Sequence, residues 1–231
     1  MITMNAYSSM QESIKHLLPE LTAYIEQGIQ LNNRCVLALA GGNTPKPLYK
    51  ALSTQGLPWS QISITLTDER WVSGDHVDSN ENMIKQILIN AVPTEPYFIP
   101  LKSNTDTVEA GAIEAHKLLT EKSPSLDVVI LGMGEDGHFA SIFPGVSNLD
   151  ALISEGTHDT CLAVYPDGKQ DRISLTYSYL TGAKIIFLVV SGDKKKAIID
   201  GSLEGRESHQ DYPIWKLLNQ TICPVKIYWN A

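Results

Sequence analysis

The hydrophobic pattern of this chain alternates between short apolar runs and longer amphipathic stretches. Over residues 9–31, apolar side chains recur every three to four positions, which predicts a helix with one buried face. Short runs of mainly apolar residues, one of them alternating with polar positions, predict strands over residues 35–40, 62–66, 128–131, 161–165, 184–190 and 225–229. Further helices are predicted over residues 45–52, 80–90, 105–122, 147–154, 177–181, 193–203 and 213–220. Residues 93–100 are predicted as a connector, and residues 172–176 are left unassigned.

Two of the predicted helices begin at residues suited to capping. Thr44 is predicted as an N-cap with Pro45 as the first helical residue, and Asp78 with Glu81 resembles a capping box. Helices that follow strands in this way predict right-handed βαβ units. The expected fold is therefore α/β and Rossmann-like, with three layers: a mainly parallel sheet covered by helices on both faces. Because no repeat or break in composition divides the chain, we expect one domain over residues 1–231.

Composition and charge exclude several classes of protein. The chain is 43% hydrophobic and 19% charged, as in ordinary globular proteins, and its net charge of −8 disfavours binding to nucleic acid or to an anionic membrane. Three widely spaced cysteines (Cys35, Cys161 and Cys223) predict neither a disulfide framework nor a zinc site. The N-terminus lacks the pattern of a signal peptide, and the longest apolar run is too short to span a bilayer. We therefore expect a cytoplasmic protein that contacts neither nucleic acid nor membrane.

The stretch 131–144 carries the most distinctive chemistry. It follows a predicted strand, contains three glycines within six residues, and places Asp136 and His138 on either side of Gly137. Ligands of open α/β sheets bind beyond the carboxyl ends of the strands, where this turn is predicted to lie. An imidazole has a reference pKa of about 6.5 and can act as a general base there. The alternative is a tight turn with a surface histidine. No third ligand is suitably spaced, so no metal is expected.

A second glycine-rich turn follows the strand over residues 35–40. Gly41, Gly42, Asn43 and Thr44 would present free backbone N–H groups and the positive end of a helix dipole to an anion. The turn matches neither a Walker loop nor a dinucleotide fingerprint, which favours a small phosphate over a nucleotide. A well-capped turn without a ligand is the alternative.

Basic residues near other strand ends are further candidates. Arg70 and Arg172 are two of only four arginines, and each could hold a phosphate or carboxylate at two points. Lys194–Lys196 begin a predicted helix, where the helix dipole disfavours cations unless an anion binds, although a solvated lysine face is the alternative. Asp68 could orient a substrate hydroxyl group or form an ordinary ion pair.

Five motifs in this order give the chain a family resemblance: residues 40–45, residues 67–72 with 78–80, residues 132–138 with 140–144, residues 172–176, and Gly192-x-x-Lys195. Together they resemble the 6-phosphogluconolactonases of the glucosamine-6-phosphate isomerase/lactonase superfamily, over nearly the whole chain. The Gly-Met-Gly-Glu-Asp-Gly-His block at 132–138 is the most specific. Ala40 and Asn43 stand where this family usually has serine, which affects only the detail of phosphate contact.

The resemblance implies the fold of that superfamily and the hydrolysis of 6-phospho-D-glucono-1,5-lactone to 6-phospho-D-gluconate in the oxidative pentose phosphate pathway. It implies no cofactor and no metal. His138 would be the general base, Asp136 or Asp68 would orient His138 or sugar hydroxyls, and Arg70 or glycine-loop N–H groups would stabilise the oxyanion. The phosphate would be held by the loop over residues 41–44, Arg172 and Lys195, with the choice among Lys194, Lys195 and Lys196 left open.

Two alternatives remain at this level. The related deaminases carry an acidic residue just before the proline of the histidine loop, where this chain has Phe143. Sugar-phosphate-sensing regulators with this fold carry an N-terminal DNA-binding module, and residues 1–34 are too few and not basic enough for one besides the first helix. Retention of His138 also disfavours a sensor. The expected state is a monomer or a small homo-oligomer with a sugar-phosphate substrate.

Overall fold

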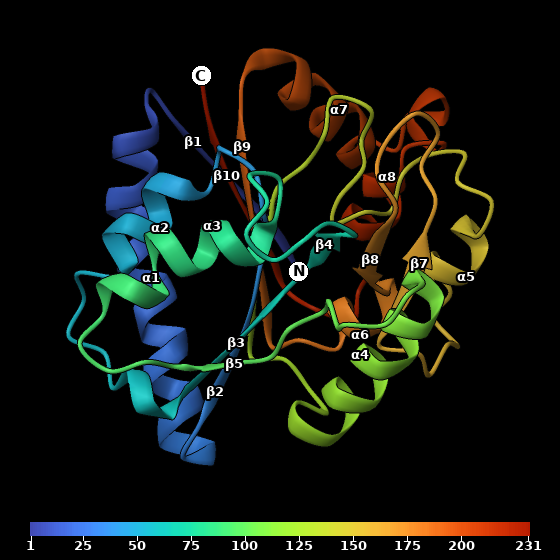
Figure 1. Ribbon diagram of the computed structural model, residues 1–231. Helices are drawn as coiled ribbons and strands as arrows, with labels where there is room; N and C mark the ends of the chain where they lie inside the picture. The colour runs from blue at the N-terminus through green and yellow to red at the C-terminus, as the bar shows by residue number, and fades with distance from the viewer.

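A seven-stranded parallel sheet forms the centre of the computed structural model, which describes residues 1–231 (Figure 1). The strands lie in the order β1-β10-β9-β6-β2-β3-β5, and every neighbouring pair is parallel. Their bounds are β1 (Ile2–Tyr7), β2 (Cys35–Leu39), β3 (Ile62–Leu66), β5 (Tyr97–Phe98), β6 (Val128–Leu131), β9 (Ile185–Ser191) and β10 (Val225–Asn230). All residues of β2, β3 and β6 are buried, as expected for strands covered on both faces.

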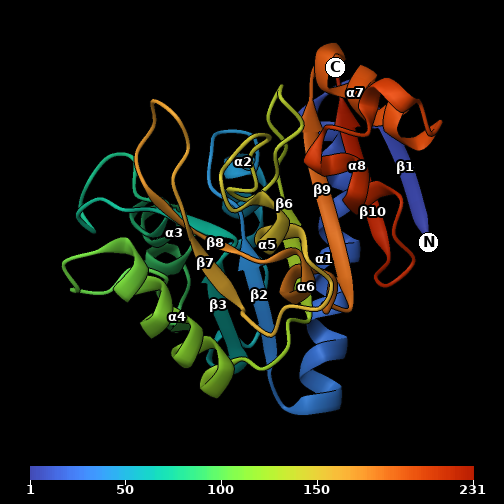
Figure 2. The same ribbon diagram turned by 90° about the vertical axis from the view of Figure 1, so that its right-hand side faces the viewer.

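Helices cover both faces of this sheet (Figures 1 and 2). On one face lie α1 (Met10–Asn32), α2 (Lys46–Leu52) and α3 (Asn80–Ile87). On the other lie α4 (Val108–Lys122), α5 (Leu149–Ile153), α6 (Tyr177–Thr181), α7 (Asp193–Leu203) and α8 (Pro213–Leu218). Short 3₁₀ helices are η1 (Trp59–Gln61), η2 (Ile89–Ala91) and η3 (Glu207–His209). The predicted three-layer α/β fold with a mainly parallel sheet is confirmed.

A second, antiparallel sheet lies beside the first and was not predicted. Its strands β4 (Asp68–Arg70), β8 (Arg172–Leu175) and β7 (Cys161–Val164) pair in that order, and α4 packs against β7 and β8. The unassigned segment 172–176 is therefore mostly strand. This small sheet brings Asp68, Arg70 and Arg172 together, so it contributes directly to the candidate site.

The edges of the main sheet also differ from the prediction. Residues 2–7, for which no element was predicted, form the edge strand β1, and the connector over residues 93–100 contains the two-residue strand β5. Both strands are only partly buried, and β5 is very short. Edge strands need little apolar sequence, which explains why the hydrophobic pattern did not reveal them.

Both predicted helix caps were wrong. The N-cap of α2 is Pro45, not Thr44, and no side chain caps that helix. The N-cap of α3 is Ser79, whose hydroxyl accepts a hydrogen bond from the backbone N–H of Asn82, so the proposed capping box at Asp78 is absent. The N–H groups of Asn80 and Glu81, in the first turn of α3, donate to the carboxylate of Glu69 in strand β4. A local sequence pattern cannot reveal such a distant partner.

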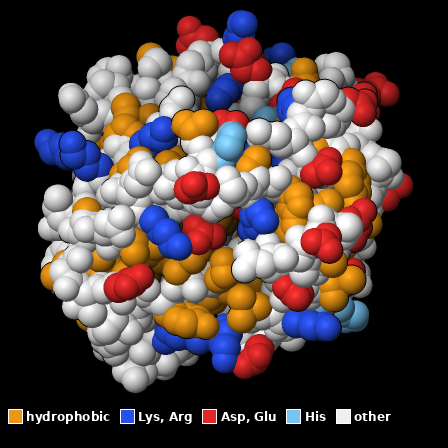
Figure 3. All heavy atoms as spheres, viewed as in Figure 1, with side chains coloured by type: hydrophobic (Ala, Val, Ile, Leu, Met, Phe, Trp, Pro, Cys, Tyr) orange, Lys and Arg blue, Asp and Glu red, His pale blue; other side chains and the backbone are white.

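The surface and the helices add two observations. Lys and Arg side chains are interspersed with Asp and Glu over the face shown in Figure 3. None of the helices combines the length and the apolar character needed to cross a membrane.

Candidate active site

A cavity of about 260 Å³ lies where four neighbouring strands of the main sheet end. The strands β9, β6, β2 and β3 are adjacent and parallel, so the loops after their carboxyl ends meet at one edge of the sheet. Nine of the ten predicted site residues line this cavity: Gly41, Gly42, Asn43, Thr44, Asp68, Arg70, His138, Arg172 and Lys195. The fold therefore brings together residues that are distributed over most of the sequence.

His138 lies in a tight turn that follows β6. The backbone N–H of Gly134 donates to the carbonyl of His138 at 2.9 Å, which closes the turn. Asp136 Oδ1 accepts hydrogen bonds from the backbone N–H of His138 at 3.2 Å and from its ring at Nδ1, 2.5 Å away. A side chain at position 134 would overlap the imidazole and this carboxylate, so the pair needs a glycine there.

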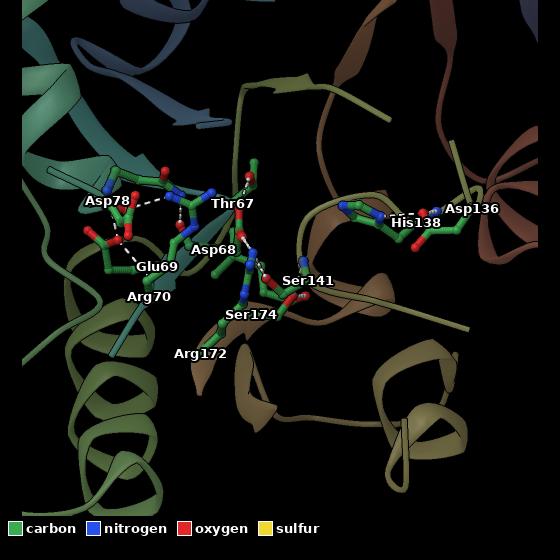
Figure 4. Close-up of polar contacts among 12 residues, drawn as sticks. Thr67, Asp68, Glu69, Arg70, Asp78, Asp136, His138, Ser141, Arg172 and Ser174 are labelled. Carbon is green, nitrogen blue, oxygen red and sulfur yellow. Dashed lines mark hydrogen bonds and ion pairs between the residues drawn. The ribbon is translucent and has the colours of Figure 1, made fainter. Parts of the chain in front are cut away.

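The environment of His138 favours a neutral ring with one free nitrogen. Burial lowers the pKa of His138 below its usual 6.5, although the hydrogen bond and charge of Asp136 act in the opposite direction. Burial alone would raise the pKa of Asp136, but its hydrogen bonds with His138 hold that pKa below the usual value. An ionised carboxylate can only accept hydrogen bonds, so Nδ1 carries the proton and Nε2 has a free lone pair. In Figure 4, the ring turns its other nitrogen away from Asp136 and toward Asp68 and Arg172.

Asp136 is the one predicted site residue that does not line the cavity. Its side chain is 43% exposed and borders a neighbouring recess with Phe143. The ring of Phe143 lies 4.2 Å from that of His138, centroid to centroid. Asp136 and Phe143 therefore hold the imidazole from outside the cavity, and neither is placed to touch a ligand in it.

Asp68 is the centre of a buried polar network on the opposite wall. The hydroxyl of Ser141 donates to Asp68 Oδ2 at 2.6 Å, and Arg172 Nη1 lies 3.6 Å from the same oxygen (Figure 4). The backbone N–H of Ser141 donates in turn to Ser174 Oγ at 3.1 Å. Asp68 is only 5% exposed, so the ion pair with Arg172 is shielded from solvent and sets the position of the guanidinium.

The turn between His138 and Ser141 contains a strained residue. Ala140 lines the cavity with a φ of 48°, in the left-handed region that disfavours residues other than glycine. A β-bridge between Phe139 and Ile142 closes this turn. Strain of this kind is common at functional sites, and here it places Ser141 against Asp68 directly after the histidine loop.

Two arginines retain hydrogen-bonding capacity at the cavity. Arg70 Nη1 donates to the backbone carbonyl of Asp78 at 2.5 Å, and Arg172 Nη1 lies 3.4 Å from the hydroxyl of Ser141. The Nε atoms of both arginines are buried and have no hydrogen-bond partner in the protein. Both arginines line the cavity, so their positive charge suits an anionic group bound there.

The glycine loop offers further donors. The backbone N–H groups of residues 41–44 make no hydrogen bond within the protein, and neither does the hydroxyl of Thr44. Gly42 adopts a φ of 87°, which other residues rarely tolerate. The loop can therefore present several neutral donors to one anion.

Only one of the three consecutive lysines faces the cavity. Lys194 lies 3.5 Å from the carboxylate of Glu135, and Lys196 forms an ion pair of 2.6 Å with Asp200. Lys195 has no carboxylate partner and lines the cavity. The geometry therefore selects Lys195 among the three.

Two residues that sequence reasoning did not single out contribute to the site. Asn80 lines the cavity, and its side-chain amide donates to the backbone carbonyl of Asp68 at 2.8 Å. Ser141 supports Asp68 as described above. Both residues lie inside motifs quoted for the family resemblance, and that was the only available signal for them. No group of three or more His, Cys, Asp or Glu side chains is arranged to hold a metal ion.

Comparison with known proteins identifies the family. The family model described as glucosamine-6-phosphate isomerases/6-phosphogluconolactonase matches residues 8–229. The chain belongs to this family. A 6-phosphogluconolactonase from Caulobacter vibrioides is 33% identical over 231 residues, which cover 99% of this chain and 97% of that protein. The resemblance inferred from the motifs is confirmed.

Solved structures of the family show the same fold. The crystal structure of a 6-phosphogluconolactonase from Shewanella baltica aligns with a TM-score of 0.94 and 31% identity, over 100% of this chain and 98% of that one. A monomeric glucosamine-6-phosphate deaminase aligns with a TM-score of 0.78 and 21% identity, over 97% and 96%. The second likeness concerns the fold alone, so the two activities within the family must be distinguished from the site.

Proposed function

We propose that this member of the family hydrolyses 6-phospho-D-glucono-1,5-lactone to 6-phospho-D-gluconate. The observation that carries the proposal is a neutral His138, held at Nδ1 by Asp136, with its free Nε2 in a cavity that is also lined by residues 41–44, whose backbone N–H groups are unpaired. The curated relatives that match nearly the whole chain are named 6-phosphogluconolactonases, which supports the same activity here.

His138 would supply the proton transfers of the reaction. Its Nε2 removes a proton from a water molecule as the water oxygen attacks the lactone carbonyl carbon. The tetrahedral intermediate then collapses, the bond from this carbon to the ring oxygen breaks, and the imidazolium returns its proton to that oxygen. The resulting carboxylic acid loses a proton to solvent. Asp136 keeps the ring in the required tautomer and stabilises the imidazolium.

The negative charge that develops on the carbonyl oxygen needs donors fixed in advance. Arg70 and the N–H groups of the glycine-rich loops are candidates: Arg70 lines the cavity and is held at the carbonyl of Asp78, and the N–H groups of residues 41–44 are unpaired. Asp68 would accept a hydrogen bond from a sugar hydroxyl while it holds Arg172. A lactone is a reactive ester, so the proposed chemistry needs neither a metal nor a covalent nucleophile.

The phosphate would lie against the loop over residues 41–44, Arg172 and Lys195. These groups come from three separate elements and all line the one cavity. Backbone N–H groups, a guanidinium and an ammonium are the donors that proteins use for phosphate. The N–H groups of residues 41–44 have no hydrogen-bond partner and Lys195 has no carboxylate partner in the protein, which supports this assignment.

The deaminase alternative is disfavoured at the histidine loop. Phe143, which precedes Pro144, is 4% exposed and packs on the imidazole of His138, and an apolar side chain cannot transfer a proton. The position where the deaminases are expected to carry an acidic residue is therefore occupied by a packing residue.

The decisive experiment measures opening of the lactone. The phosphorylated lactone is generated in place by glucose-6-phosphate dehydrogenase, and acid release is followed with and without the protein. We expect a rate well above that of the spontaneous reaction, and loss of the increase in His138→Ala. Wild-type protein that binds 6-phosphogluconate but does not accelerate opening would favour the sensing role instead.

A further inference from the structure

Glu69 is a buried carboxylate next to the site, and the mechanism above does not use it. It is 2% exposed and does not line the cavity. Its two oxygens accept four hydrogen bonds: from the backbone N–H groups of Arg70 at 2.7 Å, Asn80 at 2.8 Å and Glu81 at 2.7 Å, and from the hydroxyl of Ser79 at 3.0 Å. Three of these donors belong to the start of α3, so Glu69 caps that helix from a different strand.

The segment that Glu69 holds also fixes the guanidinium of Arg70. Asp78 immediately precedes Ser79, and its carbonyl accepts the hydrogen bond from Arg70 Nη1. Figure 4 shows Glu69, Arg70 and Asp78 as one connected group. Glu69 therefore acts on Arg70 in two ways. It accepts a hydrogen bond from the backbone N–H of Arg70, and it holds the segment whose Asp78 carbonyl accepts from the guanidinium.

The same segment contributes a second wall residue. The N–H of Asn80 donates to Glu69, while the side chain of Asn80 lines the cavity and lies so close to Gly41 that a side chain at position 41 would overlap it. A shift at the start of α3 would thus reach the glycine loop as well as Arg70.

A buried charge at the position of Glu69 lowers the stability of the fold unless other interactions compensate for it. Burial raises the pKa of Glu69 above its usual value, even though its four hydrogen bonds act to lower it. A buried carboxylate that only supported packing could be replaced by a well-packed apolar residue without loss of stability. The free-energy cost of burying this carboxylate is explained if Glu69 fixes groups of the site that must keep their position.

From these contacts we infer that Glu69 is the positioning residue for Arg70, acting through the first turn of α3, and so determines the affinity of the cavity for its anionic ligand. The inference rests on the proposed function for the identity of that ligand, 6-phosphogluconate, whose carboxylate is formed from the lactone carbonyl that Arg70 would face. Glu69 itself touches neither substrate nor reacting atoms.

A double-mutant cycle tests this role. The Kd of 6-phosphogluconate and the Tm are measured for the wild type, Glu69→Gln, Arg70→Ala and the double variant. Glu69→Gln should weaken binding by about tenfold, the size of one charge-assisted hydrogen bond, and by much less when Arg70 is already absent. The Tm should fall by a similar amount in both backgrounds. An unchanged Kd in Glu69→Gln would overturn the inference, and so would an equal loss of affinity with and without Arg70.

Two further variants control for folding. Glu81→Gln makes the same chemical change in the first turn of α3 but leaves the contacts of Glu69 intact, and we expect no change in affinity. If Glu69→Gln does not fold, Ser79→Ala removes one of the four donors, together with the N-cap hydrogen bond from Asn82, and should weaken binding in the same direction by a smaller factor. No weakening in that variant would contradict the inference.

A crystal structure of Glu69→Gln separates this inference from the proposed function. We expect the guanidinium of Arg70 to leave the carbonyl of Asp78 and the first turn of α3 to shift. This readout requires no ligand, so it holds even if the wild type neither binds 6-phosphogluconate nor opens the lactone. An Arg70 that stays in place would show that Glu69 is not its positioning residue.

Discussion

The two walls of the cavity are built in opposite ways. The His138 wall is local: Asp136 and His138 are two residues apart in one loop, and the carboxylate is 43% exposed. The Asp68 wall is long-range and nearly dry: Ser141 bonds to Asp68 across 73 residues, and the ion pair with Arg172 joins two strands of the small sheet. A partly exposed pair can change protonation during a reaction, whereas a buried pair is suited to hold a fixed geometry. Under the proposed function, the His138 wall would carry out the chemistry and the Asp68 wall would hold the geometry of the site.

The sharpest test of this division is His138→Ala. Loss of a general base should lower kcat by about 10²–10⁴-fold, while the Kd of 6-phosphogluconate stays the same because the base acts only in the chemical step. Steady-state kinetics of lactone opening and calorimetry with 6-phosphogluconate measure the two quantities. A large loss of affinity would mean that the His138 wall also positions the ligand.

Asp68→Ala should act mainly on stability. Removal of one partner leaves the charge of Arg172 buried without compensation, which we expect to lower the free energy of unfolding by about 3–5 kcal/mol in urea denaturation. The control is Asp200→Ala, which removes a partly exposed ion pair with Lys196 within α7 and should lower stability by only about 0.3–0.5 kcal/mol. Equal effects would show that the Asp68 network is not the rigid wall.

Lys195→Ala should weaken binding of 6-phosphogluconate by about tenfold, because it removes a charged donor that lines the cavity. Lys194→Ala removes an exposed lysine one residue away and should change the Kd by less than about twofold. Calorimetry with 6-phosphogluconate on both variants shows which lysine contacts the ligand. A larger loss of affinity in Lys194→Ala than in Lys195→Ala would show that Lys194 moves to the ligand.

The smallest expected effect concerns pH. Because burial lowers the pKa of His138, kcat/KM should fall on the acid side with a midpoint below 6.5, where the ring becomes protonated. Asp136 acts to raise that pKa, so Asp136→Asn should move the midpoint to lower pH. A pH–rate profile of the two proteins checks the direction. A shift to higher pH would show that another group controls the acid limb.

The predicted site came mostly from local signals. Glycine-rich turns after apolar runs located the loops of Gly41 and His138, because strand ends and tight turns leave their mark in adjacent residues. The errors came from non-local partners. The cap of α3 was assigned to Asp78, whereas Glu69 in β4 accepts from the N–H groups of that helix. The strand β8 was unassigned, since its pairing partners β4 and β7 lie far away in the sequence.

The sequence by itself determined where the central strands and helices lie along the chain, the loops that carry donors, and the proximity of Asp136 to His138. These features depend on residues within one or two turns of chain, so their physical signal is local. Only the tertiary structure decided that Arg172 pairs with Asp68, that Lys195 rather than its neighbours faces the cavity, and that Glu69 lies buried behind Arg70. Each of these depends on which elements pack together. Burial of apolar surface drives that packing, and because it is non-directional, neighbouring residues in the sequence do not reveal the partner.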